Sequence, residues 1–133
     1  MGTTMRQPKE FFSLSFQNQD IFFAELESQP DTPAWLGKLG IVERCLSELK
    51  YPEKVIIHLE DSRLEPSSLA KLADTIAERN QVFSKLAFVG IHGLAKFRLV
   101  RQLRKRKLRP NLFWKIIDDL QYAKEWLVSP NRK

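Results

Sequence analysis

The chain of 133 residues has little cysteine and histidine, with Cys45 and two histidines. A single cysteine excludes an internal disulfide and fits a reducing compartment. No apolar run reaches the roughly 18 residues that a transmembrane helix needs. Residues 1–10 are polar and lack the apolar segment of a signal peptide. These absences favour a cytoplasmic protein, and its length predicts one domain.

The residue patterns that mark an enzyme or a metal site are also missing. His58 and His92 are isolated, and no spacing of cysteine, histidine and carboxylate residues predicts a metal site. The segment Gly90-Ile91-His92-Gly93 lacks the Gly-Lys-Ser/Thr ending of a phosphate-binding loop. No serine or cysteine lies in a convincing nucleophile elbow, and no acid–base constellation is visible. We therefore expect neither an enzyme nor a bound cofactor.

Apolar periodicity predicts an α/β domain with the element order β-β-α-β-α-β-α-β-α. Strands are predicted over residues 11–16, 21–26, 54–59, 85–90 and 112–117, and helices over 34–50, 67–80, 94–107 and from 118 onward. The first two strands should form a hairpin, and the later ones should be largely parallel, joined by right-handed crossovers. We predict a four- or five-stranded mixed sheet with about four helices over residues 11–128, between tails at 1–10 and 129–133.

Local signals predict which faces some elements bury and where one helix begins. Phe12, Leu14 and Phe16 alternate along the chain, which predicts a strand with that face buried. Thr32 stands directly before a proline, which predicts a helix N-cap followed by proline at the first helical position. The β-branched run at 54–59 predicts a central strand that is covered on both faces.

The basic residues are concentrated in one stretch that contains no acid. Between Lys96 and Arg109 stand eight basic residues, whereas the other 14 basic and 16 acidic residues sum to −2 in a chain of net charge +6. Leu99 and Leu103 give this stretch the apolar side of a helix, which Ala95 and Val100 extend. Four basic residues form the outward stripe or border it, namely Arg98, Arg101, Arg104 and Lys105. Arg106 projects near the apolar side and should reach water from the helix end.

Two interpretations of this stripe stay open. It is a solvated face whose last-turn cations compensate the helix dipole, or it binds an anion, because nearby acids would normally offset such a cluster. A nucleic-acid backbone and an anionic membrane surface both fit the charge. Aromatic partners for base stacking are few, because only Phe97 lies inside the stretch. No large apolar face remains for membrane insertion if Leu99 and Leu103 enter the core.

Two segments of the C-terminal half carry a family resemblance. The first is Lys85–Lys96, and the second is Leu112–Leu127 with its Ile117-Asp118-Asp119 and Ala123-Lys124-Glu125-Trp126-Leu127 runs. Both resemble the STAS-like, SpoIIAA-like family of small bacterial domains related to anti-sigma-factor antagonists. The resemblance implies that fold over residues 11–128, and a regulatory or ligand-binding role of unassigned detail.

The resemblance also singles out Ser67 and Ser68. Anti-sigma-factor antagonists carry an Asp-Ser-Ser-Gly type segment at a helix start, and a partner kinase phosphorylates its serine. Here the corresponding residues read Pro66-Ser67-Ser68-Leu69, without the aspartate and the glycine. A phosphate on Ser67 or Ser68 would lie at the positive end of a helix. The structural alternative is an N-cap, which contributes about 1 kcal/mol.

Three functional predictions follow. The leading one is a non-catalytic STAS-like regulatory or binding module that contacts a protein or a small anionic ligand. Its candidate residues are the cationic stripe and, at a strand's C-terminal end where parallel sheets bind ligands, His92 and Gly93. The first alternative is nonspecific nucleic-acid binding through the stripe. The second is peripheral association with anionic lipid or a lipid-like ligand. A homodimer through the hairpin or an exposed helix stays open.

Overall fold

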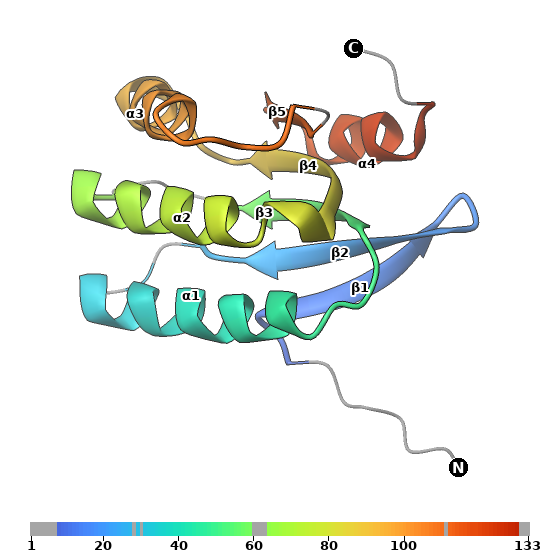
Figure 1. Cartoon of the computed structure of the whole chain (residues 1–133), viewed down its shortest axis with the longest axis horizontal. Helices are drawn as coiled ribbons and strands as arrows, with labels where there is room; N and C mark the ends of the chain where they lie inside the picture. Colours follow the sequence, from blue (N-terminus) through green and yellow to red (C-terminus); the bar gives the residue numbers. More distant parts are fainter. Residues whose placement is uncertain (1–7, 28, 30, 60–63, 111, 131–133) are drawn as a thin grey trace.

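Five strands form one mixed sheet, with α-helices packed against both of its faces (Figure 1). The structure, a computed structural model, describes residues 8–27, 29, 31–59, 64–110 and 112–130. The strands in these ranges are β1 (Phe11–Phe16), β2 (Gln19–Glu25), β3 (Glu53–His58), β4 (Phe83–Val89) and β5 (Phe113–Ile117). The helices are α1 (Thr32–Ser47), α2 (Pro66–Glu78), α3 (Gly93–Arg104) and α4 (Leu120–Val128), and a 3-10 turn η1 (Asn80–Val82) follows α2.

The strand order is β1-β2-β3-β4-β5, with β1 antiparallel to β2 and the other neighbours parallel. This order confirms the predicted α/β class, element order and N-terminal hairpin. The central strand β3 is confirmed as well, because Val55, Ile56 and Ile57 are all buried although they alternate between the two faces. Helices α1, α2 and α3 lie side by side over one face, and α4 lies over the other (Figure 1).

The hairpin turns through two residues, Gln17 and Asn18. Both have positive φ, 51° and 64°, which is the combination that type I′ turns require. At the open end of the hairpin, the carbonyl of Glu10 accepts a 2.9 Å hydrogen bond from the N–H of Glu25. The backbone pairing therefore extends one residue beyond β1. Most of the two predicted tails lies outside the described residues.

The prediction that Phe12, Leu14 and Phe16 form the buried face of β1 is wrong in part. Phe11, on the opposite face, is the β1 residue that enters the larger core, and only 4% of it is exposed. Phe12 and Phe16 are half-buried on the α4 side, where Leu14 is 51% exposed. Helix α4 has nine residues and is roughly 14 Å long, too short to cover this whole face.

Two helix starts differ from the sequence prediction, and a third is confirmed. The N-cap of α1 is Asp31, whose Oδ1 accepts a 2.8 Å hydrogen bond from the N–H of Ala34, and Thr32 is already helical. The N-cap of α2 is Glu65, without a side-chain capping bond. Helix α4 begins at the predicted acidic pair, where Asp119 accepts a 2.8 Å hydrogen bond from Tyr122.

Helix α4 is tied to the sheet by a buried lysine, Lys85 of β4, which is 1% exposed. Its Nζ donates to the carbonyl of Trp126 at 2.7 Å, and to the carbonyl and Oγ of Ser129 at 3.2 Å. Burial, together with the charges of Lys54 and Lys115, lowers the pKa of Lys85. The lysine adds a donor at the end of the helix, where the carbonyl of Trp126 also accepts from the N–H and the hydroxyl of Ser129.

Candidate functional site

The predicted cationic stripe lies on the outer surface of α3. Leu99 and Leu103 point inward and are fully buried, as the periodicity predicts. On the outside, Arg98, Arg101 and Arg104 are exposed along the helix, and the exposed Lys105 is its C-cap. Helix α3 ends three residues earlier than the predicted residue 107. It lies at the end of the helical layer beside α2, so its far side faces no further helix in the described part of the chain (Figure 1).

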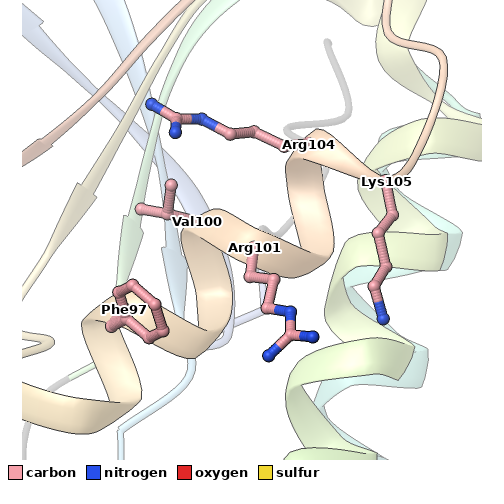
Figure 2. A pocket seen from close by; sticks show the side chains of 5 residues that line it. All are labelled: Phe97, Val100, Arg101, Arg104 and Lys105. Carbon is pink, nitrogen blue, oxygen red and sulfur yellow. The ribbon is translucent and has the colours of Figure 1, made fainter.

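A hollow of about 310 Å³ opens on this surface. We call it the Phe97 hollow, and it is lined by Phe97, Val100, Arg101, Arg104 and Lys105. Figure 2 shows Arg101 and Lys105 extending toward α2, whereas Arg104 extends in the other direction. The lining therefore combines an aromatic ring and an aliphatic side chain with three cations.

A second hollow of about 280 Å³ lies between α3 and the beginning of α2. This Pro66 hollow is lined by Pro66, Arg98, Arg101, Gln102 and Lys105. Arg101 and Lys105 line both hollows, so the two spaces lie on either side of one pair of cations. All four predicted anion-binding residues are thus brought together, and the structure adds Phe97, Val100, Gln102 and Pro66 to them.

Two of the basic residues after the stripe, Arg106 and Arg109, have structural partners. Arg106 pairs with Asp74 of α2 at 2.8 Å and donates to the carbonyls of Gln102 and Ala70. The prediction that Arg106 simply extends to water is therefore wrong, because an acid from another helix meets it. Arg109 donates to the carbonyls of Asn80 and Phe83. Among the residues that the structure describes, none of the ion pairs involves Arg98, Arg101, Arg104 or Lys105.

The outer surface of α3 is more apolar than the sequence predicted. Leu94 is 61% exposed and Phe97 is 63% exposed, although little apolar surface was expected outside the core. Val100, predicted to face the core, is only half-buried and lines the Phe97 hollow. The side of the helix on which Phe97 lies could be predicted from the sequence. Seven residues at 100° each return nearly to the same angle, so Phe97 and Arg104 lie on the same side of α3.

The strand-end candidates lie apart from these hollows. His92 is the N-cap of α3 and is exposed, with its Nδ1 3.6 Å from Oδ1 of Asp118. Gly93 is the first helical residue and has φ +61°, and Gly90 has φ +89°. These positive φ values account for both glycines, because residues with a Cβ adopt this conformation only at a cost. Neither His92 nor Gly93 lines either hollow.

The remaining polar candidates are held by the fold. The Nδ1 of His58, at the end of β3, lies 3.0 Å from Oε1 of Glu25, which accepts a hydrogen bond when that ring nitrogen carries the proton. Cys45 is half-buried, and burial raises the pKa of its thiol, which disfavours the reactive thiolate. Within the described ranges, no group of three histidine, cysteine, aspartate or glutamate side chains is placed to hold a metal ion. In the same ranges, no helix has the length and apolarity to cross a membrane.

Comparison with known proteins identifies the architecture. No family model matches the chain, and no curated protein matches it. A solved structure that does match is an uncharacterised protein of the DUF3478 family with a SpoIIAA-like fold, from Shewanella loihica PV-4. The two chains are 18% identical and superpose with a TM-score of 0.50, over 95% of this chain and 99% of the other. This chain has a SpoIIAA-like fold. The fold that the two C-terminal segments implied is therefore confirmed.

The serine pair of this SpoIIAA-like domain occupies the first turn of α2. Ser67 is exposed, whereas Ser68 is 2% exposed and points inward. Neither residue is the N-cap, because Pro66 precedes them in the helix and Glu65 holds that position. The N-cap alternative predicted for these serines is therefore wrong. Of the two hydroxyl groups, only that of Ser67 is accessible from solvent while α2 stays folded.

Proposed function

We propose that this SpoIIAA-like domain is a non-catalytic binding module that takes an anionic partner on the outer surface of α3. The observation that carries the proposal is that each of Arg98, Arg101, Arg104 and Lys105 lines at least one of two adjoining hollows. None of these four is in an ion pair with another described residue. Like charges at helical spacing repel one another. An anion placed between them replaces that repulsion with charge-assisted hydrogen bonds.

The two cations that line both hollows provide the sharpest test. Replacing Arg101 and Lys105 with glutamine removes two charges from the shared centre of the site. A matched control replaces Lys71 and Lys107, which are also exposed and line neither hollow. Both double variants have the same net charge. A difference between their affinities therefore shows that the position of the removed charges matters, and not only their number.

Binding is measured by calorimetry at low and moderate salt with inorganic tripolyphosphate and an eight-residue oligothymidylate, and by flotation with anionic and neutral vesicles. We expect the Arg101→Gln/Lys105→Gln variant to lose at least tenfold in affinity and to show a shallower salt dependence. The Lys71→Gln/Lys107→Gln control should retain most of the affinity. Absence of binding to every probe at low salt, or equal loss in both variants, would refute the proposal.

An anionic membrane surface is a second candidate, and the exposure of Leu94 and Phe97 favours it. Apolar side chains beside cations suit the boundary between headgroups and acyl chains. In this case Leu94→Ser should reduce flotation with anionic vesicles and leave tripolyphosphate binding unchanged. Equal flotation of Leu94→Ser and the unaltered chain would count against the membrane.

A further inference from the structure

Phe97 is the one phenylalanine that is exposed in the described structure. It is 63% exposed on the middle of α3 and lines the same hollow as Arg101 and Arg104. Among the described residues, none of the ring–ring or cation–ring contacts involves it. By contrast, Phe11, Phe12 and Trp126 each take part in such a contact. An apolar ring left in water among cations is a surface on which a flat group can stack.

The dimensions of the hollow limit what such a ligand can be. At about 310 Å³ it lies at the lower end of the roughly 300–1,000 Å³ of small-molecule sites. Phe97 and Val100 contribute apolar lining, and the other three lining residues are cations. A ligand that contacts both kinds of residue has an apolar, flat portion and a negative portion within a few ångströms. An unpaired nucleotide meets these requirements, because it joins a base to a phosphate through one sugar.

The relation between the two hollows extends this argument along a chain of nucleotides. Arg101 and Lys105 line both hollows, and Arg98 continues the positive charge into the Pro66 hollow. A phosphate on the shared cations therefore leaves room for a base on one side and for the next phosphate on the other. An internal base of a duplex stacks on Phe97 only after it leaves the helix, because both of its faces are already stacked there.

Resting on the proposed function, we infer that the outer surface of α3 binds single-stranded nucleic acid. One base stacks on Phe97, and successive phosphates contact Arg101, Lys105 and Arg98. Stacking on an aromatic ring tolerates every base, so binding is independent of sequence. A free nucleotide carries the same base and phosphate groups. The dependence of affinity on strand length distinguishes a nucleic-acid strand from a free nucleotide as the ligand.

The test compares four probes by calorimetry on the full chain at low salt: inorganic tripolyphosphate, ATP, an eight-residue oligothymidylate and a duplex that contains it. We expect the oligothymidylate to bind more tightly than the duplex, although the duplex has the higher charge density. Phe97→Ala should weaken oligothymidylate and ATP about tenfold and leave tripolyphosphate unchanged. Phe97→Tyr, which keeps the ring, should retain the affinity.

Two arginines give a matched pair within the same helix. Arg104 lines only the Phe97 hollow, and Arg98 lines only the Pro66 hollow. With ATP, whose single base would stack on Phe97, Arg104→Gln should weaken binding more than Arg98→Gln. With the oligothymidylate both substitutions should weaken binding. Tighter binding of the oligothymidylate than of ATP supports a strand as the ligand, whereas equal affinity supports a free nucleotide and overturns the assignment to nucleic acid.

The failure of this inference and the failure of the proposed function give different results. If tripolyphosphate and duplex bind as tightly as the single strand, and Phe97→Ala changes none of them, the surface binds anions without stacking. The inference is then wrong and the proposed function stands. If only anionic vesicles bind, the inference is wrong and the partner is a membrane. If no probe binds, both are wrong.

Discussion

Lys85 of β4 donates a 2.7 Å hydrogen bond to the main-chain carbonyl of Trp126 in the last turn of α4. The two residues are 41 positions apart, and the lysine side chain is 1% exposed. The ammonium group also lies 4.6 Å from the centre of the Trp126 indole ring. A single buried cation thus holds the end of the one α-helix that covers the second face of the sheet in the described structure.

Replacing Lys85 with methionine should destabilise the fold. Methionine fills similar space but leaves the carbonyls of Trp126 and Ser129 without the lysine donor, at a cost of about 1–3 kcal/mol. Urea unfolding measures the change. The control is Lys115→Met, an exposed lysine near the same indole ring, which should change stability by less than about 0.5 kcal/mol. An unfolding free energy that Lys85→Met leaves unaltered would show that the bond contributes nothing.

The pKa of Lys85 predicts how this contribution varies with pH. Burial and the neighbouring lysines lower the pKa in the folded protein below its ordinary value of 10.5. Between the two values the unfolded chain binds more protons, so the free energy of unfolding rises with pH. The stability difference between the unaltered chain and Lys85→Met should therefore grow as pH rises toward 10.5 and then level off. A difference that shrinks over this window would contradict the lowered pKa.

The two serines of α2 should respond differently to a negative charge. Ser68 is 2% exposed, so Ser68→Asp buries a carboxylate and should cost at least about 2 kcal/mol. Ser67 is exposed in the first turn, where a negative charge is favourable by about 0.5 kcal/mol. Thermal unfolding of both variants tests this difference. Ser67→Asp should also weaken anion binding, because Ser67 follows Pro66 at the edge of the Pro66 hollow. Equal stability of the two variants would refute the conclusion that Ser68 is buried and Ser67 is exposed.

Two glycines provide a comparison of backbone conformation. A Cβ at either Gly93 or Gly37 would meet no atom within 4 Å, so steric contacts do not separate them. Gly93 has φ +61°, and Gly93→Ala should therefore cost about 1 kcal/mol. Gly37 lies inside α1, where alanine should stabilise the helix by about 0.5–1 kcal/mol. Chemical unfolding of the two variants should give changes of opposite sign. A Gly93→Ala variant as stable as the unaltered chain, or more stable, would mean that the turn before α3 does not require glycine.

The sequence by itself determined the order of elements, the α/β class and the position of the four cations on one side of α3. These properties depend on local periodicity: alternation defines a strand, and 100° per residue defines a helix face. The same rule places Phe97 on the same side of α3 as Arg104. Whether that side of the helix faces solvent depends on which elements pack beside α3. Local alternation also could not tell which face of β1 would be better covered, because the length of α4 decides it.

Tertiary structure alone decided which charged side chains pair inside the protein and which stay exposed on its surface. Asp74 meets Arg106 because α2 and α3 pack side by side, and the end of α4 meets Lys85 because that helix crosses the opposite face. The Pro66 hollow also exists only because α2 begins beside α3. Such contacts join residues tens of positions apart, and the packing of whole elements, which no local pattern encodes, sets their distances.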